Sequence, residues 1–255
     1  MSARFEGRTV LVTGAAMGIG AATARRLAAE GASVILADCN EKVASQRVAE
    51  IGASGGRAWF QHVDLSDPSS IEAMGRQVTD RVSCLHGLVN NAGIVRWATI
   101  EETGDSDWEP QITVNLRAAA LCAKALLPLL KKGPGHIVNL SSEGAFVACG
   151  GRWVYDATKA GICALTRTMA CEFVQYGIRA NTVAPGWTVT EMHFLKSEDP
   201  VARKAELENL RIEGTVIPRL GRPEEVAAVI AFLLSDDASY MTASIVHVDG
   251  GRVPY

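Results

Sequence analysis

Tyr155 and Lys159 are the residues whose types and spacing point most directly to chemistry. Four positions apart in a helix-forming stretch, they would lie one turn apart on the same helix face. A free phenol titrates at about pH 10. A neighbouring ammonium favours the phenolate, so we expect the pKa of Tyr155 to be lowered. With Ser142 thirteen residues earlier, the pair predicts proton transfer in alcohol–carbonyl redox chemistry beside a nicotinamide.

A glycine-rich turn near the start of the chain predicts where that nicotinamide would be held. Gly14, Gly18 and Gly20 follow an apolar strand-like run at 9–12 and precede an alanine-rich helical run at 21–30. We expect Gly14 to permit the tight turn, and Gly18 and Gly20 to let the backbone approach a pyrophosphate at the helix start. Three glycines alone are a weak signal, but their place between strand and helix strengthens it.

Asp38 indicates which dinucleotide is preferred. It lies eighteen residues after Gly20, at the end of a second strand expected at 33–37. An acid there can accept hydrogen bonds from the ribose diol of NAD and would repel the 2′-phosphate of NADP. Met17 and Cys39 occupy the two positions from which an arginine could reach that phosphate, so the usual positive charge for NADP is missing. The alternative is that Asp38 only caps the next helix.

Strand and helix signals alternate along the chain, which predicts an α/β fold with a parallel sheet covered on both faces. The expected strands are 9–12, 33–37, 58–63, 85–89, 136–140, 178–184 and 245–248. We expect a long helix at 107–132 to break around Asn115, and further helices at 152–176 and 222–234. No linker or repeat appears, so residues 1–255 are expected to form one domain, with a charged insertion at about 188–218 as a lid.

Composition excludes several other classes of function. Apolar residues make up 48%, net charge is −3, and no basic patch predicts nucleic-acid binding. The longest apolar runs are interrupted well short of a membrane span, and no N-terminal stretch has a signal pattern, so we expect a cytosolic protein. The six cysteines and five histidines lack metal-ligand spacing, so no metal site is predicted.

Taken together, these motifs resemble the short-chain dehydrogenase/reductase family over nearly the whole chain. The residues that carry the resemblance are 13–20, Asp64, 90–93, Asn115, Ser142, Tyr155, Lys159, Pro185, Gly186 and 249–251. The resemblance implies a doubly wound Rossmann fold, with a seven-stranded parallel sheet in the order 3-2-1-4-5-6-7. It also implies a homotetramer.

The resemblance implies roles for individual residues as well. Tyr155 would be the acid/base, and Lys159 would lower its pKa and bind the nicotinamide ribose. Ser142 would orient the substrate, and Asn115 would hold a water in a proton relay. The full set expected at the NAD cofactor is Gly14, Met17, Gly18, Ile19, Gly20, Asp38, Asp64, Leu65, Asn91, Ala92, Gly93, Tyr155, Lys159, Pro185, Gly186, Thr188 and Thr190.

The substrate is the least defined part of the prediction. Charged and aromatic side chains stand near the expected site, and the candidates for substrate contact are Arg96, Glu143, Arg152, Trp187 and His193. Such a mixture favours a small polar alcohol, namely a polyol, sugar or cyclic diol, over a fatty or steroid substrate. A carbonyl or 3-oxoacyl reductase is the alternative enzyme, and a non-catalytic dinucleotide-sensing protein is the alternative outside catalysis. Glu143 and Arg152 could also simply pair with each other or with solvent.

Overall fold

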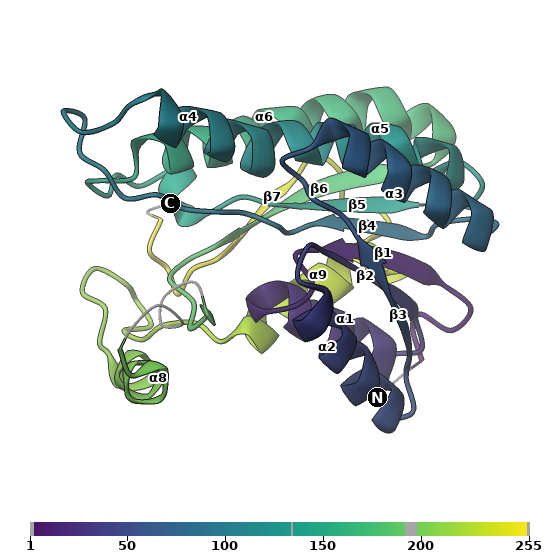
Figure 1. Ribbon diagram of the computed structural model, residues 1–255, viewed down its shortest axis with the longest axis horizontal. Helices are drawn as coiled ribbons and strands as arrows, with labels where there is room; N and C mark the ends of the chain where they lie inside the picture. Colours follow the sequence, from purple (N-terminus) through teal and green to yellow (C-terminus); the bar gives the residue numbers. More distant parts are fainter. Residues whose placement is uncertain (1–2, 134, 192–197, 254–255) are drawn as a thin grey trace.

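A single seven-stranded sheet organises the molecule. The computed structural model describes residues 3–133, 135–191 and 198–253. The strands are all parallel and lie in the order β3-β2-β1-β4-β5-β6-β7 (Figure 1), which confirms the predicted fold class and strand order. Their bounds are β1 Thr9–Thr13, β2 Ser33–Asp38, β3 Arg57–His62, β4 Gly87–Asn90, β5 His136–Leu140, β6 Arg179–Pro185 and β7 Ile245–Val248.

Helices cover both faces of the sheet. Helices α1 (Gly18–Ala29), α2 (Glu41–Ala53) and α9 (Pro223–Leu234) lie on one face. Helices α3 (Pro68–Arg81), α4 (Asp105–Gln111), α5 (Ala118–Leu130) and α6 (Trp153–Phe173) lie on the other (Figure 1). Each face has its own apolar core. This is why strands such as β1, β2 and β5 are buried along most of their length instead of alternating between buried and exposed residues.

Local signals explain where several helices begin and end. Asn40 caps α2 by accepting from the Val43 amide, and Asp67 caps α3 with Pro68 at its first position. After α6 and a short 3-10 turn, Gly177 adopts a left-handed φ of 71° and ends the helical run.

The long helix expected at 107–132 does break at Asn115. A π-helical segment, Ile112–Arg117, separates α4 from α5 and carries Asn115. The expectation that every apolar run falls short of a membrane span was wrong, because the helical run 105–130 passes that test by length and composition. In the structure, however, residues such as Leu126 and Leu130 are fully buried in the core beneath α3 and α6.

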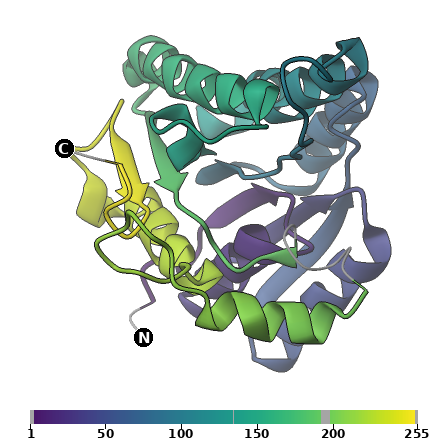
Figure 2. The same cartoon turned by 90° about the vertical axis from the view of Figure 1, so that its left-hand side faces the viewer.

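The lid segment has structure of its own. Helix α8 (Pro200–Asn209) lies at the carboxyl-terminal edge of the sheet (Figure 2). A small core of Val189, Leu207 and Leu220 holds it, and Trp187 packs against that core. A bridge between Thr188 and Gly221 joins the two ends of the segment. The lid therefore packs beside the edge where the expected site residues gather.

Candidate active site

Helix α6 is pinned to the end of β5 through Lys159. The Lys159 ammonium donates to the carbonyl of Leu140 at 2.9 Å, and the Ser141 hydroxyl donates to the carbonyl of Lys159 at 2.7 Å. A buried amide network adds to this clamp, since Asn139 bonds to Asn90 of β4 and to Thr166 of α6. These bonds set the position of α6, and therefore of Tyr155, relative to Ser142.

Ser142 and Tyr155 face each other across this clamp. Ser142 is buried, and its Oγ accepts from the Gly144 amide at 3.1 Å as the cap of the short turn Glu143–Ala145. A hydrogen bond with Ser142 favours the ionised phenol of Tyr155. Tyr155 itself is half-buried.

The expected lowering of the Tyr155 pKa by Lys159 is wrong for the protein alone. Burial raises the pKa of Tyr155, and this effect exceeds the lowering by Ser142 and Arg152. The Lys159 ammonium lies 5.6 Å from the centroid of the Tyr155 ring and is directed to the Leu140 carbonyl. Burial in turn lowers the pKa of Lys159 to about 8. Desolvation is therefore the largest cause of both shifts: it raises the pKa of Tyr155 and lowers the pKa of Lys159.

Asn115 braces the site through its side-chain amide. Its Oδ1 accepts from the Ile94 amide at 2.8 Å and its Nδ2 donates to the Ile94 carbonyl at 2.9 Å. The same Nδ2 donates to Thr158, whose hydroxyl donates to the carbonyl of Tyr155. Asn115 thus joins the loop after β4 to the first turn of α6. The water relay implied by the family resemblance stays a prediction.

The three glycines of the turn have different reasons to be glycine. A Cβ on Gly14 would lie 2.9 Å from Ala92 Cα, and one on Gly20 would lie 2.1 Å from the Gly14 carbonyl oxygen. Asn91 holds the same turn by donating to the carbonyls of Thr13 and Gly14. Gly20 is therefore required by packing inside the turn, and its approach to a ligand stays a prediction. Gly18, with φ of 54°, faces the lid.

The amino end of α1 fits a negatively charged group. Among the described residues, neither α1 nor its N-cap residue Met17 provides a capping side chain or a first-turn acid. The Gly18 amide instead donates to the Glu191 carboxylate at 2.8 Å. An anion thus already sits where a dinucleotide pyrophosphate would bind, so the residues present fit that cofactor.

Asp38 is anchored at the far end of this turn. Its Oδ2 accepts from the Ala16 amide and its Oδ1 from the Asn40 amide, both at 2.9 Å. The carboxylate therefore joins the glycine-rich turn to β2, while the neighbouring Cys39 is exposed. Asn40, and not Asp38, supplies the cap of α2. The alternative that Asp38 only caps the next helix therefore does not account for its bond to the Ala16 amide.

The remaining residues expected at the cofactor line the same edge. Asp64 is exposed and accepts from Ser66, Leu65 packs against the core, and Ile19 packs on the opposite core. Pro185 ends β6, and a Cβ on Gly186 would lie 2.7 Å from Asp249 Cα. Further residues of this edge are Thr188, which donates to the Gly186 carbonyl, Thr190, which contacts the position of Gly18, and Gly93, which lies against Lys159.

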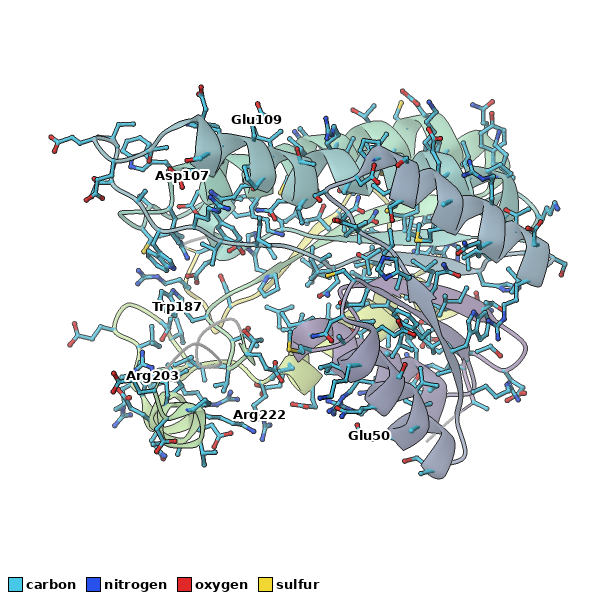
Figure 3. The ribbon with its side chains drawn as sticks, in the orientation of Figure 1. Glu50, Asp107, Glu109, Trp187, Arg203 and Arg222 are labelled. Atoms are coloured by element: carbon cyan, nitrogen blue, oxygen red, sulfur yellow. The ribbon has the colours of Figure 1, made fainter. Side chains whose placement is uncertain are left out.

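A cavity of about 250 Å³ has in its wall Glu143, the residue after Ser142, and Arg152, whose guanidinium carbon lies 5.9 Å from the centroid of the Tyr155 ring. It is lined by Glu143, Val147, Ala148, Cys149, Arg152, Trp187, Leu210, Ile212 and Arg252. Three of the predicted substrate residues are therefore brought together: Glu143, Arg152 and Trp187, the last packing toward α8 (Figure 3). Arg96 is directed away, donating to the Ser106 carbonyl, and His193 lies outside the described residues.

Buried charges on the cavity wall have unused hydrogen-bonding capacity. Glu143 is 4% exposed and Arg152 is 7% exposed. Among the described residues, Glu143 Oε2 and Arg152 Nε and Nη2 have no hydrogen-bond partner. Arg152 forms an ion pair with Asp156 at 3.4 Å, so it pairs with neither Glu143 nor solvent as the alternative had it. Burial raises the pKa of Glu143, against the lowering by Arg152 and Arg252.

Comparison with known proteins agrees with this site. A family model described as Enoyl-(Acyl carrier protein) reductase matches residues 14–252. Levodione reductase from Leifsonia aquatica is 38% identical over 256 residues, covering 98% of this chain and 95% of the relative. The chain belongs to the short-chain dehydrogenase/reductase family. This family binds nicotinamide dinucleotides, and the chain is an oxidoreductase of the family.

Two further members of the family are similar over their full length. Meso-2,3-butanediol dehydrogenase from Serratia marcescens is 37% identical over 250 residues, covering 97% of this chain and 95% of the relative. A dehydrogenase/reductase from Sinorhizobium meliloti 1021, known from its crystal structure, superposes with a TM-score of 0.89 at 33% identity. That match covers 99% of this chain and 98% of the other.

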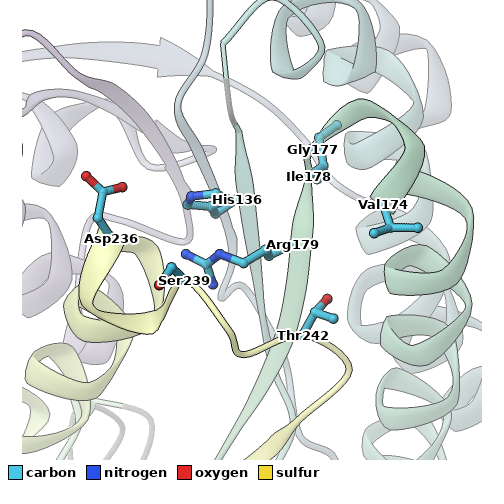
Figure 4. A pocket seen from close by; sticks show the side chains of 8 residues that line it. All are labelled: His136, Val174, Gly177, Ile178, Arg179, Asp236, Ser239 and Thr242. Carbon is cyan, nitrogen blue, oxygen red and sulfur yellow. The ribbon is translucent and has the colours of Figure 1, made fainter.

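A second hollow lies far from the chemistry of this short-chain dehydrogenase/reductase. It measures about 330 Å³ and is bordered by His136 and Arg179, the first residues of β5 and β6 (Figure 4). It therefore opens at the amino-terminal edge of the sheet, opposite Ser142. Within the described residues, no group of three or more His, Cys, Asp or Glu side chains could hold a metal.

Several residues of the site were not predicted. Ser141 and Thr158 complete the clamp, and Thr158 could have been inferred because it stands one helical turn after Tyr155. Arg252 and Glu191 come from segments distant in sequence, Glu191 lying 173 positions from Gly18. No local pattern announces such long-range contacts.

Replacing Lys159 by Met in this dehydrogenase/reductase should remove a rise in the free energy of unfolding that the wild type shows above pH 8. Burial has lowered the pKa of Lys159 from 10.5 to about 8, so the folded state holds the ammonium at a cost of about 3 kcal/mol below pH 8. Between pH 8 and 10.5 the Lys159 ammonium loses its proton in the folded state but keeps it in the unfolded state. The free energy of unfolding of the wild type therefore rises with pH relative to that of the variant. Urea unfolding of both proteins at pH 7 and at higher pH measures this difference.

The exposed Lys124 supplies the matched control. Lys124→Met removes the same charge from the exposed side of α5 and should show no such pH dependence. A free energy of unfolding of the wild type that does not rise relative to that of Lys159→Met between pH 8 and 10.5 would contradict the lowered pKa of Lys159.

Proposed function

We propose that the chain is an NAD-dependent oxidoreductase that interconverts a secondary alcohol and its ketone. The observation that carries the proposal is the convergence of Ser142, Tyr155 and Lys159 beside a glycine-rich turn whose helix end holds an anion. A bound nicotinamide supplies the hydride acceptor. Tyr155 takes the hydroxyl proton of the alcohol, Ser142 holds the same oxygen, and Lys159 keeps α6 in place.

The raised pKa of Tyr155 is compatible with this role. Burial by itself disfavours the phenolate, whereas the positive charge of an oxidised nicotinamide nearby favours it. Tyr155 therefore becomes a competent base only when the cofactor is in place. This arrangement would restrict deprotonation to the loaded enzyme.

The substrate we propose is a small polar alcohol, such as a polyol, sugar or cyclic diol. Glu143 Oε2 needs a donor and Arg152 Nη2 needs an acceptor, and both residues are buried on the wall of the same cavity. A hydroxyl group can satisfy both at once. A substrate with two oxygen functions would place one at Tyr155 and the other at Glu143 and Arg152. The names of the two relatives agree, since a dione and a diol each carry two such groups.

A reductase acting on 3-oxoacyl thioesters is the second candidate. The description of the matching family model, Enoyl-(Acyl carrier protein) reductase, favours it. The buried charges of Glu143 and Arg152 weigh against it, because a long acyl chain would leave Glu143 Oε2 and Arg152 Nη2 without a hydrogen-bond partner. A non-catalytic dinucleotide sensor is a weaker candidate, since it would not need Ser142, Tyr155 and Lys159 together.

We expect NAD to be preferred over NADP by at least about tenfold in kcat/KM, because one charge repulsion of about 1.4 kcal/mol already gives that ratio. Asp38→Ala should narrow the preference, and adding Cys39→Arg should reverse it. Glu41→Gln removes an exposed acid from the start of α2 and should leave the ratio unchanged. Equal kcat/KM for both cofactors in the wild type would exclude the proposed role of Asp38.

Removing either buried charge should impair binding of a diol selectively. In Glu143→Ala and Arg152→Ala, we expect KM for a cyclic vicinal diol to rise about tenfold or more, the size of one lost hydrogen bond to a charged group. KM for the matching monohydric alcohol should change little. Arg96→Ala is the control, because Arg96 bonds to α4 outside the cavity. Equal effects on both alcohols, or a wild-type preference for long-chain or steroid alcohols, would contradict the proposal.

We also propose that the protein acts in the cytosol as a homotetramer. Helices α5 and α6 bury one side against the sheet, while Leu121, Ala125, Leu165 and Phe173 remain partly exposed at its edge. Such apolar surface can be covered by another subunit. Light scattering should give the mass of four chains, and Leu165→Lys should reduce it. A wild-type monomer at micromolar concentration would refute the assembly.

A further inference from the structure

A carboxylate from the lid occupies the amino end of α1. Glu191 Oε2 accepts from the Gly18 amide at 2.8 Å. The lid and the start of α1 lie close together at Gly18. A Cβ on Gly18 would lie 3.3 Å from Thr190 Cγ2 and 3.5 Å from Glu191 Oε2. The absence of a side chain at Gly18 therefore lets residues 190 and 191 reach the helix end.

The local sequence leaves this helix end dependent on an outside anion. Among the described residues, Met17 offers no side-chain cap to α1, and the first turn of the helix contains no acid. Unsatisfied amides and the helix dipole make such an end favourable for negative charge. Glu191 supplies that charge from the other side of the cleft.

Two carboxylates therefore hold the two ends of the glycine-rich turn. Asp38 accepts from the Ala16 amide and Glu191 accepts from the Gly18 amide. Under the proposed function, Asp38 faces the adenosine ribose, while the pyrophosphate binds at the amino end of α1. A ribose diol is neutral and can donate to Asp38. A pyrophosphate is an anion and can only compete with Glu191.

We infer that Glu191 is an internal competitor of the cofactor's pyrophosphate, which the dinucleotide must displace from Gly18 in order to bind. The inference rests on the proposed dinucleotide site. The Gly18 amide cannot donate a full hydrogen bond to Glu191 and to a pyrophosphate at the same time. The carboxylate and the pyrophosphate would also repel each other if both lay at this amide. Glu191 thus lowers the affinity for every ligand that carries a pyrophosphate, and it ties the start of the lid to α1 until the ligand arrives.

Binding of cofactor fragments separates this effect from general changes in the cleft. Calorimetry would measure the Kd of NADH, ADP and adenosine for the wild type and for Glu191→Gln and Glu191→Ala. We expect both variants to bind NADH and ADP about threefold to tenfold more tightly, the range of a carboxylate's interaction with a helix end. Adenosine has no phosphate, so its Kd should stay within about twofold. Glu198→Gln, which removes an exposed acid from the same segment, should change none of the three.

Each other outcome overturns the inference in a recognisable way. Unchanged or weaker ADP binding by the Glu191 variants would show that the carboxylate does not compete at Gly18. An equal gain for adenosine would show that the variants merely open the lid. Thermal melts confirm that the variants are folded. A wild type that binds neither NADH nor ADP would exclude the proposed dinucleotide site, and with it the inference. If the wild type binds both and the Glu191 variants have the same Kd values, only the inference is excluded.

Discussion

The burial of one ammonium group between β5 and α6 is the constraint on which the active site depends. Lys159 donates to the last carbonyl of β5, and the next residue of the chain, Ser141, donates back to the Lys159 carbonyl. These two bonds set the position of α6 against the strand that leads to Ser142. Tyr155, one turn before Lys159, can face Ser142 only because the helix is held in this position.

The same constraint explains the electrostatics of the site. The buried amine of Lys159 and the half-buried phenol of Tyr155 both resist ionisation, so the pKa of Lys159 falls and that of Tyr155 rises. A cationic nicotinamide near Tyr155 would oppose the effect of burial there, because a positive charge favours the phenolate. The cavity wall follows the same rule, because Glu143 and Arg152 are buried with hydrogen-bonding atoms that a substrate could satisfy.

Much of the fold followed from the sequence because its signals are local or repeat along the chain. Apolar strands alternating with helices predicted the parallel sheet, and the family resemblance supplied its strand order. The break at Asn115 was predicted as well, and the structure shows it as a π-helical segment. Tyr155 and Lys159 could be placed on one helix face because four residues span about one turn.

The rest depends on contacts between distant segments, which local patterns do not contain. The pKa of Tyr155 could not be inferred from its neighbour, because the partner of Lys159 is a carbonyl of another element. Arg96 and Arg152 looked alike as substrate residues, yet one bonds to α4 and the other lines the cavity. The contact between Glu191 and Gly18 likewise exists only in three dimensions.

Single-turnover kinetics of Tyr155→Phe test the central claim most directly. With NAD bound and a cyclic diol added, NADH formation reports proton and hydride transfer without product release. If Tyr155 is the acid/base, the rate of NADH formation by Tyr155→Phe should be lower than that of the wild type by about two or more powers of ten. The Kd for NADH should stay within about twofold of the wild type, because only one hydroxyl is removed. Near-normal NADH formation by Tyr155→Phe would contradict the assignment of Tyr155, and with it the account of how this site works.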